Sequence, residues 1–316
     1  MALLEIQTLV NVSIMIILCM GFTFTYMMEG FPNFAHASYA SIGAIVSFYF
    51  TRIMGMNPYV TWPLSVLAGG VIGVLLYVVV VRPIKRVARY HEITLTLTFL
   101  VISYVIHSVG NIFSYWSRYF MGAQTKYYNL RSYDFSWDGY RGIIVVSSIT
   151  CLLLIVGIHI FLTRTKLGIG LRAASENGDL AAVLGINTDR AHMTSWFLSG
   201  GLATLAGSIM AINSGIITSR SDGLMVTVMS AAILGGLYSI YGAVIGGFLV
   251  TVTQDFLKNL FFIVFGLVAV RWQELTPIIF LLGVMILFPN GITSHRDLSI
   301  QGLLRKVLKA MDLHEN

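Results

Sequence analysis

Charged side chains are scarce in this sequence. Lys, Arg, Asp and Glu together make up 11% of the 316 residues, whereas hydrophobic residues make up 56% and the mean hydropathy is +0.80. A soluble globular protein carries about 25% charged residues, and one this apolar would expose large hydrophobic patches and aggregate. The composition therefore excludes an ordinary soluble protein and indicates an integral membrane domain.

Motifs for nucleotide, metal and redox chemistry are also missing. No Gly-Lys dipeptide occurs, so the chain lacks the G-x-x-x-x-G-K-[ST] loop that cradles phosphates, and any ATP must bind elsewhere. No H-E-x-x-H or C-x-x-C occurs and the seven His are scattered, so we expect no metal site. Cys19 and Cys151 both lie in apolar runs, which argues against a structural disulfide. We therefore expect no cofactor and no enzymatic activity.

The net charge of +6 is small for this length. It needs no nucleic-acid partner, because cationic loops on the inner side of a membrane give the same sign. We therefore expect membrane lipid, and not nucleic acid, as the surroundings of this chain.

Long charge-poor stretches indicate transmembrane helices. A span needs roughly 20 apolar residues, because hydrocarbon offers the backbone no water. The alternation of β-barrel strands is absent. We predict an all-α polytopic membrane protein with eight to ten transmembrane helices, nine being the central number, some of them short or broken. The stretches are 6–28, 31–51, 59–81, 93–117, 142–163, 193–219, 223–254 and 275–290.

The stretch 223–254 is too long for one span. Gly235-Gly236 and Gly242 interrupt it, so we expect a short segment, a break and then a full helix. The apolar run 260–270 continues that helix or its exit.

Lys and Arg gather in the short loop 82–89, in the loop 164–191 and in the tail 291–316. Nine spans place all three on one side, so the positive-inside rule predicts the N-terminus outside and the C-terminus in the cytoplasm. The loop 118–141 also holds four cations, but it is longer and rich in Tyr and Trp, so we interpret it as an outer interfacial flap. Residues 1–290 then form the transmembrane domain. The tail forms a basic amphipathic helix on the inner leaflet, or alternatively contacts a partner.

The polar segment RAASENGDLAAVLGI (172–186) lies between the predicted spans 142–163 and 193–219, on the inner side of the membrane. Asn177 is suited to cap a helix with Asp179 in its first turn, and Gly185 to end it in a left-handed conformation. This two-turn helix is too short to be stable alone. It either lies on the membrane surface or docks into another protein through an apolar face. That face carries Leu180, Ala181 and Leu184.

Six short motifs occur in order along the chain. They are NFAH with IGA (33–44), RPIKR (82–86), TKLG to LGIN (165–187), LSGGLA with LAG (198–207), ILGG with GAVIGG (233–247) and LFPNG (287–291). Together they resemble the permease subunits of ABC importers of the branched-chain amino-acid class, and the resemblance spans nearly the whole chain.

The resemblance implies a permease subunit of an ATP-driven importer in a prokaryotic plasma (inner) membrane. It implies three kinds of protein partner: a second permease that is similar or identical, two cytoplasmic ATPases that bind the ATP and Mg²⁺, and an extracytoplasmic substrate-binding protein. The implied cargo is a small polar metabolite, first of all a branched-chain or related amino acid, moved by alternating access.

In such permeases a cytoplasmic helix fits a groove on the ATPase, and here the resemblance places it at 177–185. The implied ATPase-coupling residues are Arg172, Glu176, Asn177, Asp179, Ala181, Leu184 and Gly185. The alternative is a secondary transporter or channel that acts without an ATPase. The scarcity of ionisable groups within the spans argues against a carrier coupled to protons or sodium.

Polar side chains within the apolar stretches are candidates for a translocation pathway. Gly30 and Pro32 mark a break next to Glu29, which is either a kinked re-entrant segment that lines the pathway or an ordinary turn in headgroup water. Asn33 and His36 follow this break. A second set is spaced by four residues on one helix face and either lines the pathway or bonds to neighbouring helices; it comprises Ser103, His107 and Asn111.

Several glycines are spaced for close helix packing. Contact with substrate is the less favoured interpretation for them. They are Gly69, Gly73, Gly235, Gly236, Gly242 and Gly246.

Overall fold

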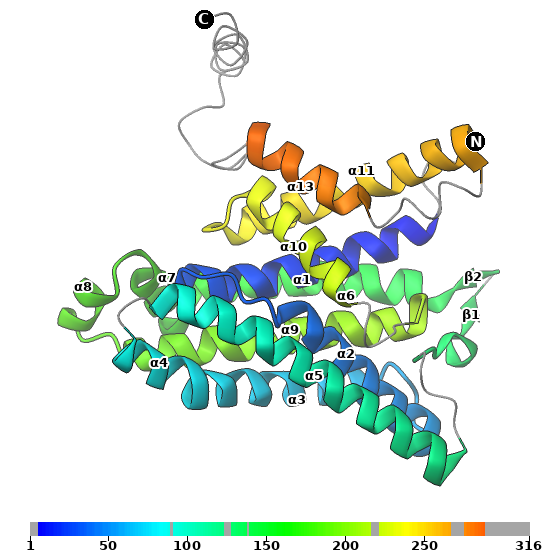
Figure 1. The fold of residues 1–316 in the computed structure, drawn as a ribbon, viewed down its shortest axis with the longest axis horizontal. Helices are drawn as coiled ribbons and strands as arrows, with labels where there is room; N and C mark the ends of the chain where they lie inside the picture. The colour runs from blue at the N-terminus through cyan, green and yellow to red at the C-terminus, as the bar shows by residue number, and fades with distance from the viewer. Residues whose placement is uncertain are drawn as a thin grey trace, which may run out of the picture.

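The apolar stretches form long helices that lie side by side along one axis in this computed structural model (Figure 1). Apart from one antiparallel pair of two-residue strands, the regular elements that the structure describes are helices, which confirms the predicted all-α membrane fold. The predicted tail lies outside the described residues. Those residues are 6–88, 91–122, 128–137, 139–215, 221–266 and 275–287.

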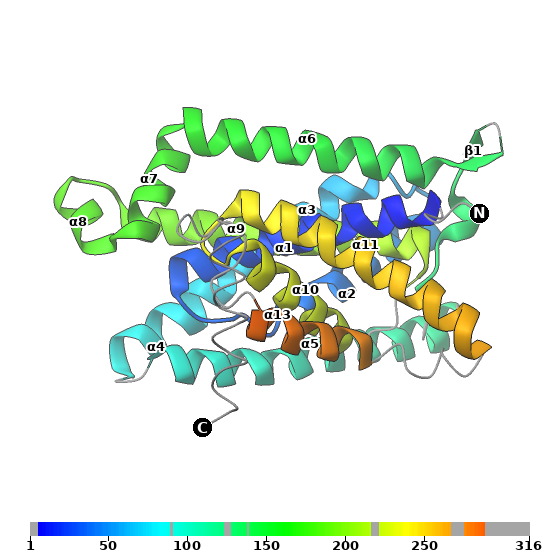
Figure 2. The ribbon, with the colours of Figure 1, turned by 90° about the horizontal axis from the view of Figure 1, so that it is seen from above.

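Two helices form the centre of the bundle. They are α1 (Ile6–Glu29) and α9 (Thr188–Asn213). In an apolar stretch of 18 consecutive residues within each helix, 89% and 83% of the residues are buried, respectively. α2 (His36–Phe48) and α3 (Thr61–Leu76) pack against α9, and α11 (Ile240–Phe265) packs against α1 (Figure 2). The first span of the chain is thus in contact with helices far away in the sequence, for example through the bond from Asn11 to Asp255, 244 residues apart.

Small residues bring α3 and α9 into backbone contact. A Cβ atom at Gly69 would collide with the carbonyl oxygen of Gly200, and one at Gly73 with that of Trp196. Thr204 lies one turn beyond Gly200, and its hydroxyl donates to the Ser65 carbonyl of α3 at 2.8 Å. Close approach of this kind is how helices gain dispersion energy in a lipid environment.

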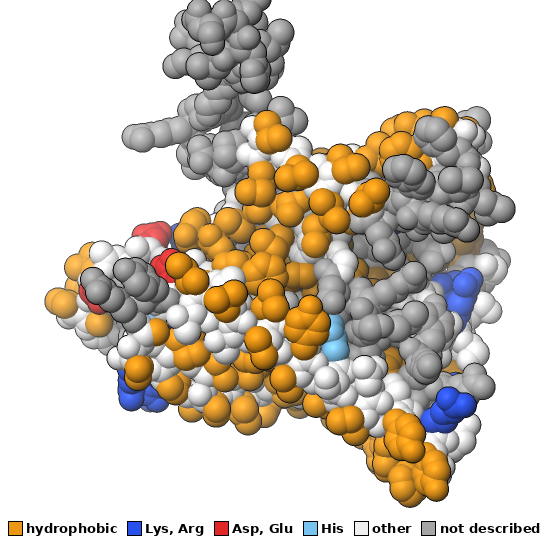
Figure 3. Space-filling view, in the orientation of Figure 1, with side chains coloured by type: hydrophobic (Ala, Val, Ile, Leu, Met, Phe, Trp, Pro, Cys, Tyr) orange, Lys and Arg blue, Asp and Glu red, His pale blue; other side chains and the backbone are white. Residues whose placement is uncertain are grey.

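The peripheral helices expose their apolar side chains. In α5 (His91–Met121) and α6 (Gly142–Arg164), only 28% and 22% of the most apolar 18 residues are buried. Hydrophobic side chains cover much of the described face in Figure 3. In a chain of this composition, that surface is the one that lipid covers.

Six helices in the described part of the chain are long and apolar enough to cross a membrane. α10 (Ser221–Gly235) and α13 (Leu275–Leu287) are shorter apolar helices. Together with α2, whose last turn continues as the π-helix η1 (Tyr49–Ile53), these make nine apolar helices. This number lies within the predicted range of eight to ten.

Helix also continues where we expected a loop. α3 runs through the π-helix η2 (Tyr77–Val81) into α4 (Arg82–Val87), so the predicted basic loop at 82–89 is helical up to Val87. Pro83 lies within this continuous helix, directly after the π-helix η2, and does not end it.

The predicted break in the stretch 223–254 is confirmed. α10 ends at Gly235, Gly236 adopts φ +107°, and α11 begins after Ser239, whose hydroxyl accepts from the Gly242 amide at 3.0 Å. Gly242 lies in the first turn of α11, so the second interruption that we expected there is wrong. A Cβ at Gly235 would collide with the Gly242 carbonyl oxygen, and one at Gly246 with the backbone of α10, so the two helices pack closely.

Polar elements occupy both ends of the bundle (Figure 1). α7 (Lys166–Glu176) and α8 (Gly178–Val183) project at the end of the bundle where α4 also lies; we call it the α8 end. At the other, the hairpin end, lie the 3-10 helix η3 (Arg131–Tyr133) and the strands β1 (Ser136–Trp137) and β2 (Tyr140–Arg141). The two predicted basic loops therefore share one end, and the aromatic flap lies at the opposite end.

Candidate functional site

α7 forms a rigid base for α8. The Thr165 hydroxyl accepts from the Gly168 amide at 3.0 Å, and Gly168 packs directly on the backbone of Phe161 in α6. Leu171 is completely buried, so α7 is fixed to the bundle by its apolar face. The sequence analysis missed α7. Its opposite face exposes the predicted coupling residues Arg172 and Glu176.

α8 has the two termini that the sequence predicts. The Asn177 side chain accepts from the Leu180 amide at 3.0 Å, and Asp179 lies in the first turn. At the other end, Gly185 has φ +81° and its amide donates to the Ala182 carbonyl at 3.0 Å. The Ile186 amide donates to the Ala181 carbonyl at 3.0 Å, which completes a Schellman motif. The short helix is therefore closed at both ends by its own residues.

The expected apolar face of α8 needs one correction. Ala181 is only 2% exposed, because the Schellman turn folds Ile186 back over it and both belong to the hydrophobic core. The side chains of Leu180, Val183 and Leu184 are 57%, 83% and 72% exposed, and they form what we call the α8 tip. Val183 was not among the predicted residues, although its position next to Leu184 in an apolar run could have indicated it.

The α8 end also holds buried polar contacts. The Glu29 side chain, 0% exposed, accepts from the Trp196 indole N–H at 2.8 Å and from His192 Nδ1 at 2.8 Å. Lys85 Nζ lies 2.5 Å from its second oxygen. Glu29 and His36 are both buried, so the alternative of a turn in headgroup water is wrong for this break.

A second, more exposed pair lies beside it. Arg82 Nη2 contacts Asp189 Oδ2 at 2.8 Å, and the Tyr77 hydroxyl donates to Asp189 Oδ1 at 3.1 Å. Both side chains of the ion pair are more than a third exposed, so this pair adds little stability. The ring of Tyr77 stacks on His192 at 5.5 Å between centroids.

The break after α1 leads the chain back into the bundle. Residues 30–35 have no regular structure, and α2 begins at His36, whose Nε2 donates to the Leu18 carbonyl at 3.0 Å. Leu18 lies about 16 Å along α1 from Glu29 at 1.5 Å per residue. α2 is thus a half-helix whose first residue is bonded partway along α1 and is completely buried.

Buried polar groups surround this start of α2. Asn33 is 0% exposed and its side-chain oxygen accepts from the Ala35 amide at 3.1 Å. His36 is also completely buried, with Nδ1 at 3.1 Å from the Ser199 hydroxyl of α9. The bonds that fix the depth of this segment come from α1 and α9, so the sequence could offer a re-entrant segment only as one of two alternatives.

The polar stripe of α5 divides in the structure. Ser103 and His107 are buried, and His107 Nε2 lies 3.2 Å from the Ser38 hydroxyl of α2. Asn111, one turn further on, is exposed on the surface of the chain. His107 thus bonds to a neighbouring helix, as one of the two alternatives expected. Asn111 instead faces the surroundings of this chain.

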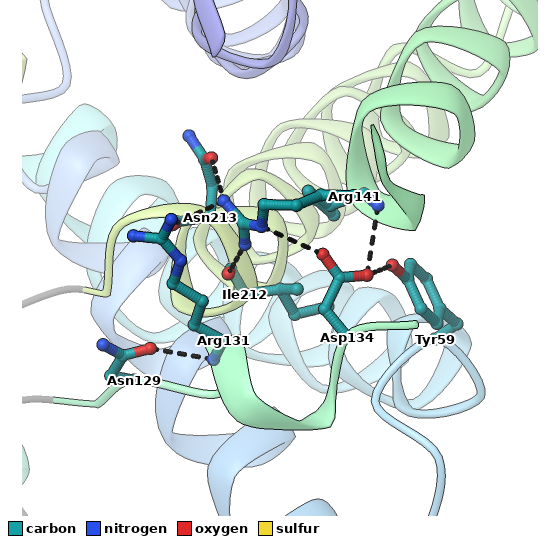
Figure 4. A network of polar contacts seen from close by, with 8 residues as sticks. Tyr59, Asn129, Arg131, Asp134, Arg141, Ile212 and Asn213 are labelled. Atoms are coloured by element: carbon teal, nitrogen blue, oxygen red, sulfur yellow. Dashed lines mark hydrogen bonds and ion pairs between the residues drawn. The ribbon is translucent and has the colours of Figure 1, made fainter. Parts of the chain in front are cut away.

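The hairpin end is held by a second buried carboxylate (Figure 4). Asp134 accepts from the Tyr59 hydroxyl at 2.5 Å and from the Ile143 amide at 3.2 Å, and it pairs with Arg141 Nε at 3.2 Å. Burial, and then the Asp134 carboxylate, raise the pKa of Tyr59 above its ordinary value, so its hydroxyl remains a donor.

The guanidinium of Arg141 also caps a central helix. It donates to the Ile212 carbonyl at 2.6 Å and to the Asn213 carbonyl at 3.2 Å, at the C-terminus of α9 (Figure 4). These contacts attach the flap to the bundle. Within the described ranges, no group of three or more His, Cys, Asp or Glu is placed to hold a metal ion.

Comparison with known proteins gives consistent matches. A family described as "Branched-chain amino acid transport system / permease component" matches residues 5–288. The "Probable branched-chain amino acid transport permease protein LivH" of Methanocaldococcus jannaschii is 31% identical over 281 residues, which cover 89% of each chain. The "High-affinity branched-chain amino acid transport system permease protein LivH" of Salmonella typhimurium is 25% identical, over 87% of this chain and 90% of the relative.

A shorter match covers part of the chain. The "Autoinducer 2 import system permease protein LsrC" of Yersinia enterocolitica is 30% identical over 142 residues, 43% of this chain and 38% of the relative. No solved structure matches this chain.

Proposed function

This chain belongs to the family of branched-chain amino acid transport permease components, and from that premise we propose how it works within a transport complex. It is a multi-pass membrane permease subunit. We propose that it serves an ATP-driven importer, that partner ATPases bind the nucleotide and Mg²⁺, and that a second permease completes the pathway. A substrate-binding protein would deliver cargo at the hairpin end.

The α8 tip is the observation that carries this proposal. Leu180, Val183 and Leu184 are apolar and exposed on a helix that projects beyond the spans, at the end that carries the cations of α4 and α7. Exposed apolar side chains on a rigid projection are typical of a contact with another protein. Arg172 and Glu176 are exposed on the preceding helix α7 and are suited to ion pairs at the rim of that contact.

An energy source outside this chain fits the sequence. The chain has no phosphate-cradling loop. Motion of a nucleotide-binding partner can reach the spans only through a rigid element, and α8 is closed by its own caps and continuous with α9 through four residues. We therefore place the α8 end in the cytoplasm, in agreement with the positive-inside rule. The membrane is then a prokaryotic inner membrane with the N-terminus outside.

The pathway is proposed to run along α5. This helix packs on α2 and α4 and leaves much of its length exposed, including Asn111. A polar amide facing lipid near the middle of a span is costly, so this face fits a watery path shared with the second permease. The buried His107 and the half-helix α2 lie directly behind it.

The cargo is proposed to be a branched-chain or related small amino acid. The names of two relatives that match nearly the whole chain support this class. The polar groups near the proposed path are hydroxyls, amides and imidazoles, which suit a zwitterion in transit without a tight membrane site.

Substitution at the α8 tip tests the docking. Val183→Glu places a carboxylate at the centre of the proposed contact, which we expect to weaken ATPase binding by about 2 kcal/mol or more, roughly 30-fold. The measurement is the amount of ATPase that co-purifies with the tagged permease. Val183 is 83% exposed, so the variant should still fold and insert.

The matched control is Tyr140→Glu, an exposed position at the hairpin end. It should leave ATPase co-purification unchanged. Equal recovery of ATPase with the wild type and with Val183→Glu would contradict the proposed docking.

A further inference from the structure

Glu29 joins three elements at the α8 end. It is the last residue of α1, and its carboxylate is held by Lys85 of α4 and by His192 and Trp196 of α9, at 2.5, 2.8 and 2.8 Å. Its side chain is 0% exposed. A buried carboxylate is tolerated only where such partners replace water, so the relative positions of these elements are tied to this one group.

The α9 partners of Glu29 follow α8 closely in the chain. α8 ends at Val183 and α9 begins at Thr188, so His192 is on the second turn of α9. A displacement of α8 reaches this turn directly. It then either carries Glu29 along or separates Glu29 from its partners.

Glu29 is also next to the segment that enters the bundle. The chain runs from Glu29 directly into residues 30–35, which lead to Asn33 and His36. Movement of the end of α1 therefore acts on the start of the half-helix α2.

An aromatic contact extends this connection to α5. Trp196 donates to Glu29 and is completely buried, with its ring 5.1 Å from that of Phe99. Phe31, two residues after Glu29, lies 5.6 Å from the same Phe99 ring. Phe99 is on α5, two turns before His107, so Glu29 is linked to the helix of the proposed pathway through two packed rings.

We propose that Glu29 is a positioning residue that transmits the movement of α8 to the start of α2 and to α5, and so couples ATP hydrolysis to transport. The inference rests on the proposed function. It assigns the coupling to one carboxylate and its partners, beyond the docking of α8 itself. An alternative is that Glu29 only stabilises the fold, as any buried and paired carboxylate does.

Asp134 provides the matched control for that alternative. It too is a buried carboxylate, paired with Arg141 and bonded to Tyr59 and the Ile143 amide, but it lies at the hairpin end. A purely structural effect should be similar at both positions, whereas coupling should depend on Glu29 alone.

The experiment compares Glu29→Gln and Asp134→Asn in the complete complex, isolated through a tag on this chain and reconstituted in liposomes. The measured quantity is the number of ATP molecules hydrolysed per amino acid transported. For Glu29→Gln we expect this ratio to rise about tenfold, since a hydrogen bond to a charged group is worth roughly that factor, while hydrolysis itself continues. For Asp134→Asn we expect an unchanged ratio, even where less complex is recovered.

Lys85→Met is the second variant, for the case in which Glu29→Gln does not assemble. This variant removes the partly exposed cation and keeps the bonds from His192 and Trp196 to Glu29, and the ratio should rise in the same direction. An unchanged ratio in both Glu29→Gln and Lys85→Met would overturn this inference and leave the proposed function standing. The same rise in Asp134→Asn would do so too. A wild-type complex without ATP-driven transport would overturn the proposed function and this inference with it.

Discussion

At the scale of single residues, the absence of a side chain decides how closely the central helices approach. Gly73 of α3 lies against the carbonyl oxygen of Trp196, and Gly69 against that of Gly200. No larger residue fits there without moving α3 away from α9. Because lipid gives helices no hydrophobic reason to associate, this close packing contributes directly to stability.

Gly73→Val should therefore destabilise the protein. Overpacking of a tight contact costs about 1–3 kcal/mol, which should appear as a lower midpoint of thermal unfolding in detergent. The control is Gly157→Val on α6, where a Cβ would meet no atom within 4 Å, and its midpoint should barely change. Equal losses at both positions would contradict the α3–α9 packing described here.

Residues whose role depends on neighbouring backbone were predictable from the sequence. Asn177 and Gly185 were identified correctly because helix caps depend on local geometry alone. Ala181 was assigned to the wrong side, because helical spacing shows that residues share a face but not which face the protein covers. Glu29 was noticed, but its partners Lys85, His192 and Trp196 are 56 to 167 residues away.

At the scale of elements, half-helices and peripheral helices give the bundle its polar features. α2 starts inside the bundle, where its first turn is held by Leu18 and Ser199 of other helices. α5 packs on few neighbours and carries polar residues along a span. α5 is therefore suited to move relative to the tightly packed helices α1, α2 and α9.

Thiol labelling tests the proposed path along α5. Cys19 and Cys151 are buried free cysteines, so the background should be low. In the assembled complex, Asn111→Cys should react with a small water-soluble thiol reagent, because a watery path covers this face. Leu153→Cys on the lipid-exposed side of α6 should react far more slowly, since hydrocarbon excludes the reagent. Equal rates at the two positions would contradict the path.

Element boundaries show the limit of reasoning from hydropathy. Spans such as α6 were predicted within about a residue, because a charge-poor run of about 20 residues has few alternatives in lipid. α7 and the helical continuation through α4 were missed, because charged helical turns outside the hydrocarbon resemble loops in composition. The depth of α2 depends on contacts with α1 and α9 and could not be read from its own residues.

At the scale of the whole molecule, two polar ends are connected by an apolar bundle. The hairpin end is anchored through Asp134 and Arg141, and Arg141 also binds the last carbonyls of α9. At the α8 end, Glu29 of α1 is bonded to His192 and Trp196 in the N-terminal part of α9. α9 thus links the two ends, and we propose that energy enters at the α8 end.

One measurement tests this central assignment most directly. Leu184→Cys, at a side chain 72% exposed on the α8 tip, is treated with a membrane-impermeant thiol reagent in vesicles of known orientation. We predict rapid labelling only where the cytoplasmic face is accessible, and strong protection once the partner ATPases are bound. Labelling from the outer face, or labelling that the ATPases leave unchanged, would contradict the account.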